Sequence, residues 1–282
     1  MSLKPFKSIG IGVAYSPNLK ANLFEAARLS VFFGSKLFLI HVGENSEDKL
    51  VMLKTILKSF EKDSLDYEVV FKSGNPVDVI LSTTEEKKID LLILGAVQRE
   101  RFLKYYVGSI ARKITRMAKC SILLLIKPSV ERFACEHIVV NGLKDPKTEQ
   151  TIKAAFYVAT KLNAEKITIV EEIKQEQISV NVDDDKSLRR ANIIKERIRL
   201  RENSRIKEII SHIPETYTKN KTIKLQPIFG KKGYSIGHYA QIRRADLLVM
   251  NAPSKMTFWD RLFPHDIEHI LTELPTDVLI LQ

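Results

Sequence analysis

The chain has 282 residues, 44% of them hydrophobic and 28% charged, which is typical of a soluble globular protein long enough for two domains. Its two cysteines, Cys120 and Cys135, are too few for a disulfide framework or a four-thiolate metal site. The net charge of +11 raises the question of a nucleic-acid or anionic-membrane partner. Because no apolar segment approaches the ~20 residues of a bilayer span, we expect a cytoplasmic protein without membrane insertion.

The first half alternates strand-like and helix-like segments. Apolar runs typical of strands cover residues 8–14, 36–42, 67–74, 90–94 and 121–126. Apolar residues at helical spacing lie between them, over 18–33, over 50–60, from Pro76 and from Gly108. This order predicts an open parallel sheet with right-handed crossovers. Ligands bind such sheets at the carboxyl ends of the strands, near the switch in strand order, so the loops after the first and fourth strands are candidate sites.

The stretch 89–127 has the clearest sequence pattern of a strand-loop-helix unit in the chain. Its apolar run Leu91–Leu94 indicates a strand covered on both faces, and this strand runs into Gly95. A second glycine, Gly108, precedes Ser109 and a helical pattern. Such a strand-loop-helix unit directs backbone N–H groups toward an anion.

The second half repeats this order. A strand at 137–142, a helix at 151–164 and a strand at 166–170 follow Pro128, so we infer an internal duplication with domains 1–130 and 131–282. Five more elements end the chain: a strand in TIKLQPIFG, a helix near 234–244, the strand 245–250, and a final helix and strand near 264–273 and 277–281.

A long insertion interrupts the second half between residues 174 and 221. Its basic helix has nine lysines or arginines and two glutamates between Lys186 and Lys207. The segment lacks aromatic residues for base stacking, so nucleic-acid binding there would be phosphate-driven and strongly salt-dependent. The alternative is a solvated helix that buries its isoleucines, and we do not expect nucleic acid to be the main partner. The acidic run Asp183–Asp185 before the helix favours an N-cap over a cation site.

Several segments together resemble one family. Gly95, Gln98, Gly108 and Ser109 are spaced like the G-x2-G-x9-G-[ST] nucleotide loop of universal stress proteins. The agreement extends to FKSIGIGVAYSPN, LFLIHV, SGNPVDVI and MAKCSILLLI. The whole chain looks like a tandem member. The resemblance implies an α/β fold with two flavodoxin-like domains of the adenine nucleotide alpha hydrolase-like type, each a five-stranded parallel sheet with helices on both faces.

The resemblance also implies a ligand, ATP or AMP, with Mg²⁺ only if ATP is bound. It carries the candidate nucleotide-binding role to six positions: Val42, Gly95, Gln98, Arg99, Gly108 and Ser109. The glycines let the backbone approach phosphate, and Ser109 and Arg99 can donate hydrogen bonds to it. We expect no catalytic residue, and therefore a stress-response sensor or scaffold in place of an enzyme.

Two departures weaken the nucleotide prediction. Gln98 stands where the family has a glycine, which is costly if that position needs a positive φ. Ala14 stands where nucleotide-binding members have an acidic residue against the ribose. Losing that charge-assisted hydrogen bond costs roughly 1.5 to 3 kcal/mol, or about tenfold to a hundredfold in affinity.

The second copy departs further. Asn251, Ser254 and Pro264-His265 replace its loop residues, and proline has no N–H for a phosphate, so we predict no nucleotide there. Phe258 and Trp259 make this loop apolar, which suits a protein partner or a second subunit, as in a dimer. The tandem domains would then act as a scaffold that mimics the family's dimer.

Two short patterns are weaker signals. His265, Glu268 and His269 spell the H-x-x-E-H zinc pattern, but no further ligand-bearing helix follows, so we predict no metal site. His41 ends the second strand and is expected to pack or hydrogen-bond there, without a catalytic role.

Overall fold

The computed structural model describes residues 6–98, 105–178, 181, 183–230, 234–252, 270–271 and 273–282. The chain forms two compact units, one of residues up to Ala134 together with Leu271–Gln282, and one of Cys135–Ile270. Both are built from parallel strands and helices, which confirms the predicted α/β fold class. The division into duplicated domains 1–130 and 131–282 stays a prediction.

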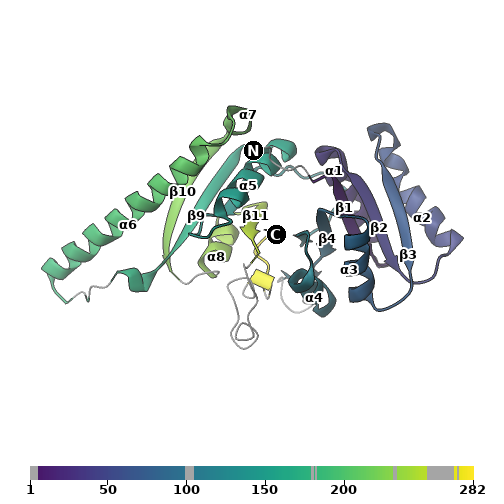
Figure 1. Ribbon diagram of the computed structural model, residues 1–282, viewed down its shortest axis with the longest axis horizontal. Coiled ribbons are helices and arrows are strands. Elements are labelled where there is room, and N and C mark those ends of the chain that lie inside the picture. The colour runs from purple at the N-terminus through teal and green to yellow at the C-terminus, as the bar shows by residue number, and fades with distance from the viewer. Residues whose placement is uncertain are drawn as a thin grey trace. The chain divides into compact units, whose positions relative to one another are not determined.

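The first unit holds a parallel sheet in the order β3-β2-β1-β4-β7. Figure 1 shows β3, β2, β1 and β4 of this sheet. The strands are β1 (Ser8–Val13), β2 (Lys36–Val42), β3 (Tyr67–Lys72), β4 (Leu91–Gly95) and β7 (Ser121–Leu125). The connecting helices are α1 (Leu19–Phe33), α2 (Glu47–Leu57) with the short η1 (Lys58–Asp63), α3 (Pro76–Glu86) and α4 (Ser109–Met117). The strand order reverses between β1 and β4, so right-handed crossovers put α1 and α2 on one face and α3 and α4 on the other. The carboxyl ends of β1 and β4 form the switch point of this sheet.

Local sequence sets the helix ends. Asn75 caps α3 by accepting a hydrogen bond from the Val77 N–H (3.0 Å), and Pro76 follows at the first helical position. Gly34 ends α1 in the left-handed conformation, with φ of 65°. In β4, Leu91 to Leu94 are all buried, as the apolar run predicts.

The last strand of the chain joins the first unit. In β12 (Asp277–Leu281), Val278, Leu279 and Ile280 pair antiparallel with Leu124, Leu123 and Ile122 of β7. The Ile126 N–H donates to Asp277 Oδ1 (2.8 Å), and Gln282 Nε2 donates to the Ala118 carbonyl (3.0 Å). The sequence predicts the strand but not this partner.

The second unit contains parallel strands in the order β10-β9-β8-β11. The strands are β8 (His137–Asn141), β9 (Lys166–Lys174), β10 (Thr222–Gly230) and β11 (Leu247–Asn251). The helices are α5 (Thr148–Leu162), α6 (Asp185–Ser211), α7 (Glu215–Thr218) and α8 (Tyr234–Ile242), with the short η2 (Gln175–Gln177). One contact recurs in both units: Asp90 Oδ2 accepts from the N–H groups of Lys7 and Ser8, and Asp246 Oδ2 accepts from those of Glu136 and His137.

The basic insertion forms α6, whose first turns extend beyond the edge of the sheet (Figure 1). Asp184 caps the helix, accepting from the Ser187 N–H (2.6 Å), while Ser187 Oγ accepts from the Asp184 N–H (3.0 Å). This capping box confirms the N-cap interpretation of the acidic run. Among the described helices, none combines the length and apolar composition that a membrane crossing needs.

Candidate functional site

The loop after β4 contains a hairpin. The Ala96 N–H donates to the Leu125 carbonyl (2.7 Å), and then β5 (Val97–Gln98) pairs antiparallel with β6 (Tyr105–Tyr106). Gln98 therefore has an extended backbone that any residue can adopt, and the position has no need of glycine. The side chain of Gln98 and the whole of Arg99 lie outside the described residues. The conformational objection to Gln98 is thereby removed.

The loop ends at the N-terminus of α4. Gly108 is the N-cap, with φ of −61° and ψ of 163°, and its carbonyl accepts from the Arg112 N–H (2.8 Å) to close the first turn. The first turn contains no acidic residue, and Ser109 is exposed. The first N–H groups of a helix have no intrahelical partner and carry the positive end of its dipole. Gly108 and Ser109 thus frame a position suited to an anion.

Asn22 of α1 adds a polar group at the switch point. A Cβ placed on Gly95 would lie 3.5 Å from Asn22 Oδ1 and 3.8 Å from Nδ2, so the amide lies against this glycine. Oδ1 is buried and has no hydrogen-bond partner in the described part of the protein. A buried carbonyl oxygen that lacks a donor is costly, so this atom is ready to accept a hydrogen bond from a ligand.

A histidine, a lysine and a tyrosine contact one another at the carboxyl ends of β1 and β2. His41 is buried, and its Nδ1 lies 3.0 Å from the Val13 carbonyl, so this nitrogen carries the proton and donates. Its Nε2 accepts from Lys49 Nζ (3.3 Å), and Tyr15 packs edge-on against the ring at 4.9 Å. These contacts confirm a packing and hydrogen-bonding role for His41. Burial raises the pKa of Tyr15 above its ordinary value, which keeps the hydroxyl protonated.

The other two predicted positions lie on the same edge of the sheet. Val42 is the last residue of β2 and is half-buried. Ala14 follows β1 and is exposed, and it offers no polar side chain to a ribose. The structure therefore places Val42, Gly95, Gly108 and Ser109 at the carboxyl edge of one sheet, where parallel sheets bind ligands.

The chain's last residues hold the return arm of the loop. The Val107 N–H donates to the Leu271 carbonyl (3.0 Å), and the Leu274 N–H donates to the Tyr105 carbonyl (2.9 Å). Lys127 lies over the Tyr105 ring, 5.7 Å from its centroid. The entry to α4 is thus fixed by residues about 165 positions away in sequence, which no local pattern indicates.

Several predictions concern residues outside the described ranges. The altered loop of the second copy is described only at Asn251 and Ala252, and His265, Glu268 and His269 are not described. Within the described residues, no group of three or more His, Cys, Asp or Glu is arranged to hold a metal ion. Burial raises the pKa of the Cys120 thiol to about 11, so this cysteine is a poor nucleophile at neutral pH.

Comparison with known proteins finds a family match in the first unit. Residues 45–125, from the loop after β2 to the end of β7, match the model of the universal stress protein family. A universal stress protein of Methanocaldococcus jannaschii is 28% identical over 79 residues, which cover 28% of this chain and 46% of that protein. A second, from Methanothermobacter thermautotrophicus, is 28% identical over 65 residues, covering 23% of this chain and 44% of that protein. The matched region thus spans less than half the length of these curated relatives.

The solved structures extend the likeness in fold. A universal stress protein from Archaeoglobus fulgidus superposes with a TM-score of 0.70 at 14% identity, covering 99% of both chains. At that identity the likeness concerns the fold alone. The family match is thus confined to residues 45–125 of the first unit, and over the whole chain the likeness to universal stress proteins is one of fold.

Proposed function

We propose that the first unit binds an adenine nucleotide, ATP or AMP, and that the protein acts in the stress response as a nucleotide-dependent sensor, without catalysis. The phosphates would lie at the N-terminus of α4, against Gly108 and Ser109. The adenosine would lie along the carboxyl ends of β4, β1 and β2, toward Val42. Mg²⁺ would enter only with ATP.

One observation carries this proposal, the open N-terminus of α4 at the switch point of the sheet. It offers orphan N–H groups, an exposed serine and no acidic side chain in the first turn. Asn22 supports it, because its unpartnered Oδ1 lies beside Gly95 and can accept from a ribose hydroxyl. This amide could replace part of the hydrogen bonding that Ala14 cannot supply.

Isothermal titration with ATP and AMP, each with and without Mg²⁺, tests the proposal. We expect saturable heat with at least one nucleotide, and an effect of Mg²⁺ on ATP only. Ser109→Asp should abolish this binding or weaken it about tenfold to a hundredfold, because the new carboxylate repels phosphate. An acidic residue in the first turn also favours the helix, so α4 should remain folded.

Ser59→Asp is the matched control, because it adds the same charge at an exposed serine of η1 in the same unit. It should leave nucleotide binding unchanged. Absence of heat with either nucleotide, or equal binding by the two aspartate variants, would show that the α4 N-terminus holds no nucleotide.

A second candidate is a nucleotide-independent interaction scaffold, and α6 favours it. Leu188, Ile193 and Leu200 of this basic helix are 46%, 54% and 55% exposed. Apolar side chains among cations suit an acidic protein partner better than nucleic acid, which needs the cations alone. The tandem arrangement, supported by the matching Asp90 and Asp246 contacts, would present this surface. Absence of nucleotide binding, with no DNA or RNA shift at low salt, would select this candidate.

A further inference from the structure

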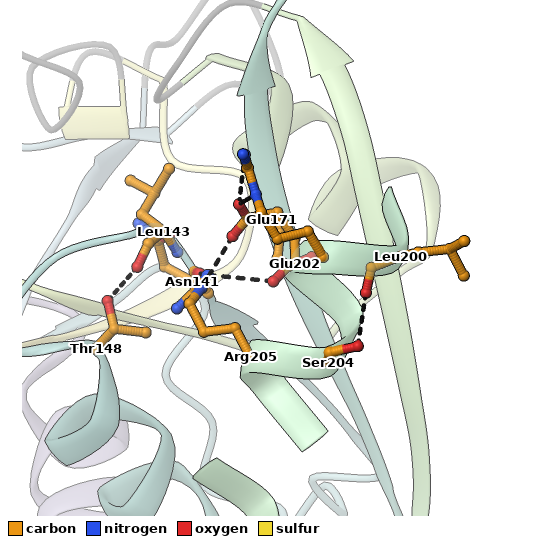
Figure 2. Close-up of polar contacts among 10 residues, drawn as sticks. Asn141, Leu143, Thr148, Glu171, Leu200, Glu202, Ser204 and Arg205 are labelled. Atoms are coloured by element: carbon orange, nitrogen blue, oxygen red, sulfur yellow. Dashed lines mark hydrogen bonds and ion pairs between the residues drawn. The ribbon is translucent and has the colours of Figure 1, made fainter. Parts of the chain in front are cut away.

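A buried charged cluster joins α6 to the sheet of the second unit. Arg205 of α6 donates from Nη2 to Glu171 Oε1 of β9 (3.2 Å) and to the Gly142 carbonyl after β8 (2.5 Å). Its Nε donates to Glu202 Oε2 on the preceding turn of α6 (2.9 Å). Figure 2 shows the three side chains together, with Leu200 pointing away from them. We call Glu171, Glu202 and Arg205 the latch cluster.

The latch cluster places two buried carboxylates on the guanidinium of Arg205, because the second guanidinium in contact with it, that of Arg201, is 64% exposed. Glu171 is 2% exposed and Glu202 is 8% exposed, and both bind Arg205. Glu171 Oε2 is buried and has no hydrogen-bond partner in the described part of the chain. A buried anionic oxygen without a donor is strongly disfavoured, and two carboxylates that share one cation disfavour each other's charge.

The surroundings decide which carboxylate binds a proton. Arg201 donates to Glu202 Oε1 (3.0 Å), so Glu202 has two guanidinium partners. Burial raises the pKa of Glu202, but the hydrogen bonds and charges of Arg205 and Arg201 outweigh burial and leave it below its ordinary value.

Among the described residues, Arg205 is the one cationic partner of Glu171. Burial raises its pKa to about 7, and the charge of Glu202 adds to this rise while Arg205 opposes it. On its other sides, Pro227 of β10 lies opposite Glu171, and the polar Asn141 ends β8. The adjacent Glu172 is engaged with the N–H of Ile236 (2.7 Å).

In the first unit, the position that corresponds to Glu171 has a different residue and a different hydrogen bond. Ser8 pairs with Lys36 as His137 pairs with Lys166, so five residues further on, His41 corresponds to Glu171 and Val13 to Gly142. His41 donates directly to the Val13 carbonyl. In the second unit the Gly142 carbonyl accepts instead from Arg205 of α6, which also donates to Glu171.

We propose that Glu171 and Arg205 form a proton-dependent latch that holds α6 on the second unit when Glu171 is protonated and loosens it when Glu171 is ionised. With Glu171 protonated, the buried part of the cluster has one carboxylate for one guanidinium. Ionisation adds a second buried negative charge, which water would solvate if α6 moved away. This latch is independent of nucleotide binding in the first unit.

The direction of the pH dependence follows from proton linkage. The docked state binds more protons than the undocked state between the ordinary pKa of Glu, about 4.5, and about 7. Docking therefore weakens as pH rises through this window and becomes constant above it. Between pH 6 and pH 8 the equilibrium for opening should rise about tenfold.

Hydrogen exchange of the full-length protein at pH 6 and pH 8, corrected for the intrinsic pH dependence of exchange, tests this proposal. Amides in the second half of α6 should lose about tenfold in protection at pH 8, while those of α1 should not. In Glu171→Gln, which cannot ionise, α6 should be equally protected at both pH values.

Glu208→Gln is the matched control, because it removes a carboxylate from an exposed position of the same helix, and it should keep the wild-type response. A second variant, Glu202→Gln, leaves Arg205 to Glu171 alone and should shift the response to lower pH. Equal protection of wild-type α6 at both pH values, or an unchanged response in either Glu171→Gln or Glu202→Gln, would overturn the latch.

Discussion

His41 and Glu171 occupy corresponding register positions in β2 and β9. Their side chains nevertheless make different hydrogen bonds. The imidazole of His41 has an N–H that reaches the Val13 carbonyl at 3.0 Å, so the contact stays local. In the second unit, Glu171 instead contacts Arg205 of α6, 34 residues further along the chain. The residue type at this position therefore decides whether the hydrogen bonds at the strand end come from the neighbouring strand, as in the first unit, or from α6 of the insertion, as in the second.

Replacing His41 with phenylalanine tests how much the hydrogen bond from His41 to the Val13 carbonyl stabilises the fold. The new ring can keep the edge contacts with Tyr15 and Phe71, at 4.9 and 5.6 Å between centroids, but cannot donate to Val13. Leaving this buried carbonyl without its donor should cost about 1 to 3 kcal/mol, measured by urea unfolding. His238→Phe, at an exposed position of α8, should cost nothing measurable. Equal unfolding midpoints for the two variants would contradict the structural role of His41.

Among the residues of the candidate site, sequence spacing finds those of the loop and misses those that pack against it. Gly95, Gly108 and Ser109 belong to one strand-loop-helix unit, which local patterns reveal. Asn22 becomes a site residue only because the sheet order sets α1 against the end of β4. Arg205 meets Gly142 across 63 positions. Contacts made by tertiary packing leave no periodic signal in the chain.

At the scale of elements, helix starts are the most predictable feature. Pro76 and the acidic run before α6 both mark helix starts, because caps satisfy N–H groups within three residues. The β5–β6 hairpin is not predicted, since its strands are two residues each and lack alternation. The long-range partner of β12 is unpredictable for a different reason, because an apolar strand can pair with any free edge.

The cap of α6 gives a prediction at this scale. Asp184→Ala removes the side-chain acceptor for the Ser187 N–H, so amides in the first turn of α6 should exchange faster. Hydrogen bonds from Ser187 lower the pKa of Asp184, so the cap is complete above the ordinary pKa of an aspartate and is lost as pH falls below it. Asp183→Ala, next to the cap, should leave these amides unchanged. Faster exchange in both variants would assign the effect to charge alone.

The first unit is completed by the last residues of the chain, Leu271–Gln282. Residues 271–282 supply β12 to the edge of β7 and hold the end of the loop between β4 and α4 through Leu271 and Leu274. Val278, Leu279 and Ile280 are at most 2% exposed, so this strand is part of the core of the first unit. The candidate site is therefore incomplete in any fragment that contains only the first half of the chain.

A fragment of residues 1–134 tests this dependence. Without β12, the apolar edge of β7 is unpaired, and an unpaired edge is a template for another strand. The antiparallel pairing of Leu123 with Leu279 indicates that a second β7 could take the place of β12, so the fragment should self-associate in light scattering. A synthetic peptide of residues 271–282 should return the fragment to a monomer, whereas the same peptide with Leu279→Asp and Ile280→Asp should not. A fragment that is monomeric without any peptide would show that β7 does not require a partner strand.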